Sequence, residues 1–217
     1  MFDNCCKNTN FVEKYDMKFK KFTDFKKLQH IEELFGIAGF KTSFMGNFEL
    51  VVPSDSLTIT LERNKSRANR TEKAISENII APILNEVANN NEDKISLFSG
   101  EPLEGNKEQG LNGVIDFIIS NIAYSYDPKA PIIALVEAKK QDIEAGIPQC
   151  IAEMLAAKII NEREGKPKYY IYGCVTTGND WVFLRLNETK VLIESNVLYL
   201  NDLPKLLGAF QWIINQY

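Results

Sequence analysis

Apolar positions follow two different spacings along the chain. From Ile75 to Val87 they recur every four residues, which predicts an amphipathic helix over 71–88 with Thr71 as its N-cap. Pro82 inside this stretch predicts a kink or an early break of the helix. The pattern then changes to three apolar runs of strand length with turn-rich segments between them: KISLFSGEPL, GVIDFIIS and PIIALVEAK.

Helical and extended patterns continue to the C-terminus. Residues 147–165 predict a second helix, with a proline in its first turn and a glycine at its end. Residues 169–177 predict another strand, and 181–194 predict a hairpin that turns near 187–188. The apolar positions of residues 203–214 predict a C-terminal helix that serves either the core or an interface.

The N-terminal third has a weaker pattern. A helix is expected over 22–34, and the segment 48–64 is expected to be irregular, with short extended pieces. The element order from residue 71 onward is helix, three strands, helix, strand and further strands. This order predicts one α/β domain over 71–217, with residues 1–70 as a helical and irregular extension packed on it.

Composition excludes several classes of protein. The chain has 217 residues, of which 45% are hydrophobic and 25% charged, as is ordinary for a globular protein. No apolar stretch approaches the roughly 20 residues that a bilayer requires, and no secretory signal is visible, so we expect a cytoplasmic protein with no membrane contact. The four cysteines lack C-x-x-C spacing and His30 is the single histidine, which argues against zinc sites and Ser-His-Asp catalysis.

Charge is unevenly distributed. The net charge is −4, but residues 1–73 contain 13 Lys and Arg against 10 Asp and Glu. Clustered cations of this kind can follow the phosphates of a nucleic acid, and a solvated loop and helix explains them equally well. The candidate nucleic-acid-binding residues in this basic stretch are Arg63, Lys65, Arg67, Arg70 and Lys73.

Three charged residues interrupt strands that are otherwise apolar. Asp116 lies within GVIDFII, whereas Glu137 and Lys139 end the run IIALVEAK and share one face of it, because residues two apart in a strand point the same way. Burying an unpaired ion costs several kcal/mol, so these residues need a partner, a metal or a cleft. Two carboxylates suit a hard cation such as Mg²⁺, and the lysine can hold or activate water. A buried structural ion-pair triad is the alternative.

Two further polar residues have candidate roles. A helical wheel places Glu77 at the edge of the apolar arc beside Leu84, so it either faces inward toward the carboxylates or lies exposed on the helix. Gln149 begins the second helix and forms its one polar stripe with Glu153. Gln149 can therefore hydrogen-bond to a ligand carboxylate, a water or a phosphate, or it is an ordinary helix-start residue.

The motif Asp116, then Glu137-Ala138-Lys139 on consecutive predicted strands, resembles the PD-(D/E)XK nuclease superfamily. Stretches such as GVIDFIIS, LVEAKK and GIPQCIAEMLAAK are similar to an uncharacterised bacterial branch of it. The resemblance covers about residues 70–190 and implies a restriction-endonuclease-like core, α-β-β-β-α-β, with a central mixed sheet flanked by helices. Two departures concern Ile115, which stands where many members have proline, and Lys140, which is expected to point away from Lys139.

The resemblance also implies an activity, namely phosphodiester hydrolysis that depends on Mg²⁺ or Mn²⁺. Asp116, Glu137 and Glu77 would be metal ligands, Lys139 would position or activate water, and Gln149 resembles a glutamine that some branches carry. DNA is a more expected substrate than RNA, and a homodimer is possible. A catalytically silent nucleic-acid-binding or assembly module on the same fold is the alternative, and a purely structural α/β interaction protein is a third.

Overall fold

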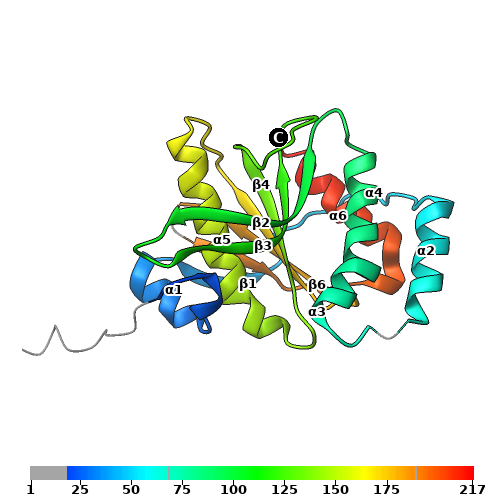
Figure 1. Ribbon diagram of the computed structural model, residues 1–217, viewed down its shortest axis with the longest axis horizontal. Helices are drawn as coiled ribbons and strands as arrows, with labels where there is room; N and C mark the ends of the chain where they lie inside the picture. The colour runs from blue at the N-terminus through cyan, green and yellow to red at the C-terminus, as the bar shows by residue number, and fades with distance from the viewer. Residues whose placement is uncertain (1–18, 68, 189) are drawn as a thin grey trace, which may run out of the picture.

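A mixed β-sheet forms the centre of the molecule (Figure 1). The computed structural model describes residues 19–67, 69–188 and 190–217. The strands are β1 Ala38–Thr42, β2 Ser96–Asn106, β3 Leu111–Ser120, β4 Ile132–Ala138, β5 Ile171–Thr176, β6 Asp180–Leu186, β7 Lys190–Glu194 and β8 Leu198–Tyr199. Their order is β1-β7-β6-β5-β4-β3-β2, with β8 paired to the start of β6. The pairs β4–β5 and β1–β7 are parallel, and the other neighbours are antiparallel.

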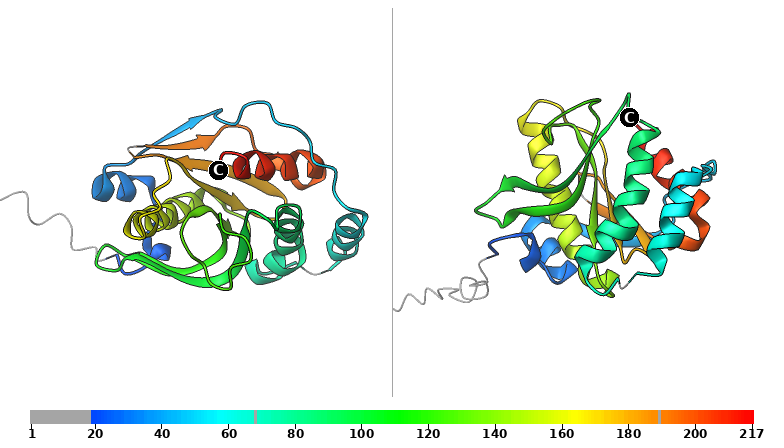
Figure 2. Two further views of the ribbon diagram at one scale, coloured as in Figure 1. Left: turned by 90° about the horizontal axis from the view of Figure 1, so that it is seen from above. Right: turned by 45° about the vertical axis from the view of Figure 1, so that its right-hand side comes forward.

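Helices cover both faces of this sheet, as Figures 1 and 2 show. The α-helices are α1 Leu28–Phe35, α2 Asp55–Lys65, α3 Glu72–Ile75, α4 Ala81–Asn89, α5 Ile143–Arg163 and α6 Leu203–Ile214. Shorter turns are η1 Phe22–Asp24, η2 Ser76–Ile80 and η3 Leu200–Asp202. One buried apolar cluster lies between the sheet and α1 and α5, and a second lies between the sheet and α2, α4 and α6. The predicted α/β class, with a central mixed sheet flanked by helices, is therefore confirmed.

The elements predicted from residue 71 onward occur in the predicted order. All seven residues of β4 are buried, as expected of a strand that is apolar on both faces. The buried apolar residues of α6 belong to the core on the sheet. The second helix starts earlier than predicted, because Asp142 caps it by accepting a hydrogen bond of 3.0 Å from the N–H of Ala145. Among the described residues, no helix combines the length and apolarity that crossing a membrane requires.

The N-terminal segment is more regular than predicted. The expected helix over 22–34 is divided into η1 and α1, and α1 ends at Gly36 in the left-handed conformation, with φ of 67°. β1 pairs in parallel with β7, so part of the expected extension completes the sheet. Residues 1–18 of that extension lie outside the described residues.

The segment 48–64 is predicted to be irregular, which is confirmed for residues 48–54 and wrong for residues 55–64. It contains α2, whose N-cap Ser54 accepts a hydrogen bond of 3.1 Å from the N–H of Leu57. Leu57 and Leu61 are buried one helical turn apart, against the second apolar cluster. The β-branched run Thr58 to Thr60 imitates a strand in the sequence, and the packing of the two leucines prevails over it.

The helix predicted over 71–88 contains an irregular turn, in keeping with the break expected at Pro82. Five residues form the wider π-turn η2, in which the N–H of Ala81 donates to the carbonyl of Ser76. Pro82 has no N–H for the carbonyl of Asn78, and the side-chain amide of Asn64 on α2 donates to that carbonyl instead, at 2.7 Å. The π-turn shifts the helical register by about one residue, which changes the faces to which its side chains point.

Candidate functional site

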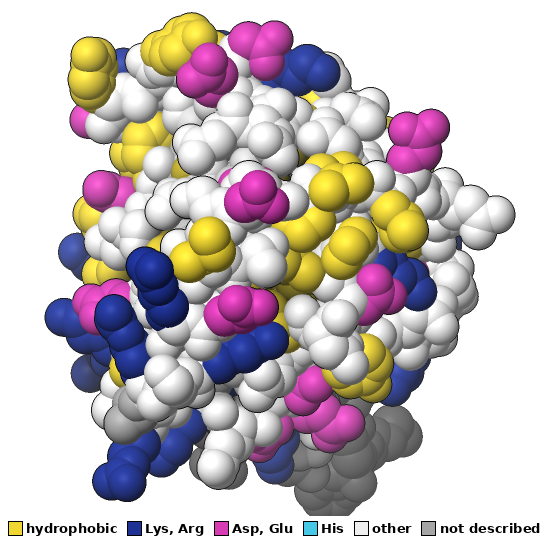
Figure 3. Space-filling view, turned by 90° about the vertical axis from the view of Figure 1, so that its right-hand side faces the viewer, with side chains coloured by type: hydrophobic (Ala, Val, Ile, Leu, Met, Phe, Trp, Pro, Cys, Tyr) yellow, Lys and Arg dark blue, Asp and Glu magenta, His cyan; other side chains and the backbone are white. Residues whose placement is uncertain are grey.

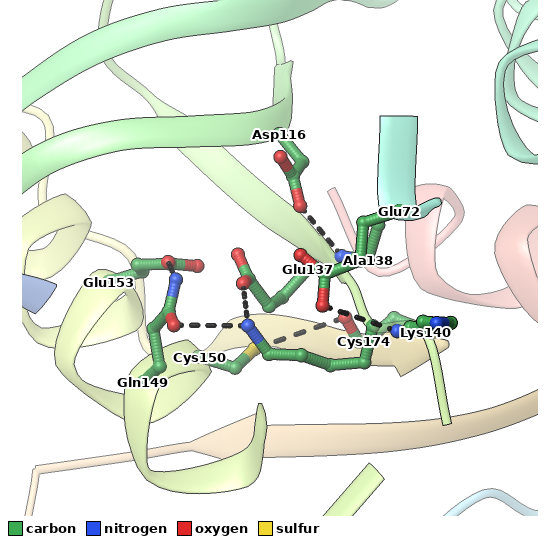
Figure 4. A network of polar contacts seen from close by, with 10 residues as sticks. Glu72, Asp116, Glu137, Ala138, Lys140, Gln149, Cys150, Glu153 and Cys174 are labelled. Atoms are coloured by element: carbon green, nitrogen blue, oxygen red, sulfur yellow. Dashed lines mark hydrogen bonds and ion pairs between the residues drawn. The ribbon is translucent and has the colours of Figure 1, made fainter. Parts of the chain in front are cut away.

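The strands β3 and β4 separate where the candidate residues lie. Their last paired residues on this side are Phe117 and Val136. Asp116 lies one residue before Phe117 on β3, and its Oδ2 accepts a hydrogen bond of 2.8 Å from the backbone N–H of Ala138 (Figure 4). The carboxyl group of Asp116 thereby takes the place of a backbone partner and is held at the end of β4, beside Glu137.

Glu137 and Lys139 form a close ion pair at the same end of β4. The Nζ of Lys139 lies 2.5 Å from the Oε1 of Glu137, and the Glu137 residue is only 3% exposed. The same Nζ donates to the side-chain carbonyl of Gln149 at 3.1 Å. Space for the lysine depends on Gly146 of α5, where a Cβ would lie 2.9 Å from the Lys139 Cγ. The structure therefore brings together four predicted residues: Asp116, Glu137, Lys139 and Gln149.

Glu153 extends this network into the core. The side-chain amide of Gln149 donates to the Oε1 of Glu153 at 3.0 Å, and Glu153 is fully buried on α5. Its other oxygen has no hydrogen-bond partner among the described residues. Glu153 was recognisable in the sequence as part of a polar stripe, but that stripe did not identify it as a member of the site.

Burial and crowding shift the pKa values of these groups. Burial and the nearby Asp116 raise the pKa of Glu137 to about 7, although Lys139 opposes this shift. Burial also raises the pKa of Asp116, and it raises that of Glu153 well above its usual range. Burial by itself lowers the pKa of Lys139, but the charge and hydrogen bond of Glu137 reverse this, so the net shift is upward. A cation placed between the carboxylates would stabilise their ionised forms.

The expectation that Glu77 faces inward is wrong. Its side chain is 65% exposed and forms a surface ion pair of 3.8 Å with Lys73. The cause is the π-turn, which invalidates a helical wheel drawn with 3.6 residues per turn across it. Glu72 is the helix carboxylate nearer the site, because its Oε1 accepts a hydrogen bond of 3.3 Å from the N–H of Lys140 (Figure 4). The charge of Glu72 acts on the pKa of both Asp116 and Lys139.

The predicted basic residues lie on the surface around the end of α2 and the start of α3. Figure 3, which looks at the side carrying α2, shows Lys and Arg side chains gathered toward its lower left. All five are exposed, namely Arg63, Lys65, Arg67, Arg70 and Lys73. The segment that carries them leads directly into Glu72, so the basic surface and the candidate site are neighbours along the chain.

The donor set at the site suits a hard divalent cation with few protein ligands. Asp116 and Glu137 offer two carboxylates, and burial together with the charge of Asp116 raises the pKa of Glu137. Mg²⁺ commonly binds to one or two carboxylates and keeps several waters. Within the described ranges there is no group of three or more His, Cys, Asp or Glu side chains placed to hold a metal ion. An ion bound here would therefore have at most Asp116 and Glu137 as carboxylate ligands, and water or substrate would complete its coordination.

Comparison with known proteins provides no family for this chain. No protein-family model matches the sequence, and no curated protein is detectably similar to it.

Proposed function

We propose that this protein is a Mg²⁺-dependent nuclease that hydrolyses phosphodiester bonds, preferentially in DNA. One observation carries the proposal: two carboxylates and an ammonium group, from Asp116, Glu137 and Lys139, meet where two neighbouring strands separate. The element order α-β-β-β-α-β around them also supports a restriction-endonuclease-like core. Mn²⁺ is the expected substitute for Mg²⁺, because both favour oxygen ligands.

The side chains have separate tasks in this mechanism. Asp116 and Glu137 would hold the ion, which when bound stabilises negative charge on the phosphate oxygens. Lys139 is held between Glu137 and Gln149, so its third N–H can point to a water or to a phosphate oxygen. Gln149 and Glu153 fix the direction of the ammonium group, and the surrounding burial keeps its charge poorly screened.

One observation favours a second candidate function, a catalytically silent nucleic-acid-binding or assembly module. The Glu137 carboxylate, which would have to bind the ion, is already paired with Lys139. A buried ion pair with a supporting glutamine can persist for structural reasons alone. This candidate has the same fold and the same basic surface, so cleavage activity is what distinguishes the two.

The test is cleavage of labelled single- and double-stranded DNA and RNA in about 10 mM Mg²⁺ or Mn²⁺, with EDTA as a blank. This concentration is high because Mg²⁺ held by few protein ligands binds weakly. Wild type is compared with Asp116→Asn and Lys139→Met, and Lys94→Met is the control because Lys94 is exposed and outside the site. We expect both site variants to lose at least about 100-fold in rate, as when one preorganised charge-stabilising group is removed. Equal rates for wild type and Lys139→Met would contradict the proposed site.

Thermal unfolding in the same buffers separates the two candidates. If no substrate is cleaved but Mg²⁺ raises the melting temperature of wild type and not of Asp116→Asn, the ion site exists without catalysis. That result would favour the silent module. Cleavage that persists in both variants and in EDTA would indicate a contaminating nuclease.

A further inference from the structure

A polar pocket of about 420 Å³ adjoins the candidate site on its α3 side. Its walls come from the loop after β4, the loop between β5 and β6, the end of α2 and the first turns of α3 and η2. Lys140 follows the candidate catalytic lysine directly, and its backbone N–H is held by Glu72. Figure 4 places Lys140 beside Glu72, on the opposite side of the network from Gln149 and Glu153.

Two lysines give this pocket a positive charge. Lys65 and Lys140 both line it and are both exposed, and neither forms an ion pair with any described residue. Asp180 is the one carboxylate among the lining residues in the described part of the chain. The remaining polar lining consists of amide and hydroxyl groups, which can donate hydrogen bonds to an anion: Asn69, Gln141, Thr177 and Asn179.

Internal contacts hold the walls of the pocket in place. Gly178, with φ of 82°, lies so close to α3 that a Cβ there would be 2.8 Å from the Ile75 side chain. Its N–H donates to the Thr176 hydroxyl at 2.9 Å. On the opposite wall, the side chain of Asn69 is hydrogen-bonded to both Asn64 and Asn78. The pocket is therefore formed before any ligand arrives, which lowers the entropic cost of binding.

We propose that this pocket binds a backbone phosphate of the DNA strand next to the phosphate that is cleaved, with Lys140 and Lys65 as its contacts. The inference rests on the proposed function, because it takes the strand to cross the carboxylates of Asp116 and Glu137. Successive phosphates follow closely along a strand, with a rise of about 3.4 Å each, so a strand at the carboxylates brings further phosphates to the adjoining pocket. Lysines bind such phosphates as point charges and fix the register of the strand without reading its sequence.

The test measures binding without cleavage. Fluorescence anisotropy in EDTA follows a labelled 20-nucleotide DNA, single-stranded and as a duplex, over a range of salt concentrations. Because one phosphate contact is lost, we expect the double variant Lys65→Gln, Lys140→Gln to reduce the slope of log K against log salt by about 0.7 for the single strand and about 0.9 for the duplex. The matched control is Lys94→Gln, Lys190→Gln, which removes the same charge from exposed positions outside the pocket.

The outcomes separate this inference from the proposed nuclease. Reduced slope in the pocket variant but not in the control supports the phosphate site, even if no metal-dependent cleavage is found. Equal slopes in wild type and both variants overturn the site, even if the protein is an active nuclease. Absence of DNA binding by wild type overturns it too. A third result would also overturn it: millimolar inorganic phosphate stabilises wild type, but the DNA slope is the same for wild type and the pocket variant. The pocket would then bind a free anion. Thermal unfolding confirms that each variant is folded.

Discussion

The buried carboxyl group of Glu137 should make the stability of this protein fall as pH rises. Its pKa is about 7 in the folded protein, compared with the ordinary value of 4.5. Below pH 4.5 the group is protonated in both the folded and the unfolded chain, so it imposes no cost. Between these two values the unfolded chain releases the proton and the folded protein retains it. The free energy of unfolding therefore decreases through this interval and levels off above pH 7.

The size of the decrease follows from the shift in pKa. Each unit corresponds to about 1.4 kcal/mol, so the contribution of Glu137 is roughly 3 kcal/mol between the acid and the alkaline limits. This is a large part of the 5–15 kcal/mol that is typical of a folded domain, so roughly 3 kcal/mol is readily measured. If Mg²⁺ binds the ionised form as proposed, it should oppose the loss above pH 7. At about ten times its Kd, the ion would restore about 1.4 kcal/mol.

Urea unfolding of wild type and Glu137→Gln at a series of pH values measures this contribution. The glutamine cannot ionise, so its free energy of unfolding should fall less than that of wild type, by roughly 3 kcal/mol. Glu144→Gln is the matched control, because Glu144 is an exposed glutamate at the start of α5. Parallel pH profiles for wild type and Glu137→Gln would refute the assignment of a strongly raised pKa to Glu137.

Two further substitutions test contacts that support the fold, one on β7 and one beside Lys139. The Glu194 carboxylate accepts hydrogen bonds from the backbone N–H groups of residues 44–45, and its pKa is lowered, although burial opposes this shift. Glu194→Gln should lower the free energy of unfolding, measured with urea at neutral pH, by about 1–3 kcal/mol. The difference from wild type should shrink as pH falls through the folded-state pKa of Glu194. Gly146→Ala places a methyl group against Lys139 and Val175. Gly146→Ala should lower the free energy of unfolding by about 1–3 kcal/mol and reduce the rate of the proposed cleavage. Equal cleavage rates for wild type and Gly146→Ala would show that Gly146 does not confine Lys139.

The central part of the site was predictable because its charges interrupt apolar strands. Asp116, Glu137 and Lys139 cannot be accommodated singly in a buried sheet, so the sequence already requires them to meet. The contact between Asp116 and the N–H of Ala138 was not predictable, because it depends on where the two strands separate.

The misplacement of Glu77 has a physical origin in tertiary structure. Its orientation depends on a π-turn, and that turn is supported by the bond from Asn64 on α2 to the carbonyl left free by Pro82. α2 was itself obscured by β-branched residues, so the partner of the irregular turn could not be anticipated. Local sequence spacing therefore predicted the strands better than it predicted the first helix.

Binding of a divalent ion by Asp116 and Glu137 is the central requirement of the proposed function. Mn²⁺ titration followed by electron paramagnetic resonance counts bound ions without requiring a substrate. Wild type is predicted to bind one ion at this site at neutral pH, Asp116→Asn to bind it much more weakly, and Glu77→Gln to bind it as wild type does, because Glu77 is exposed and paired with Lys73. Equal Mn²⁺ binding by wild type and Asp116→Asn, or no binding by either, would contradict the metal centre.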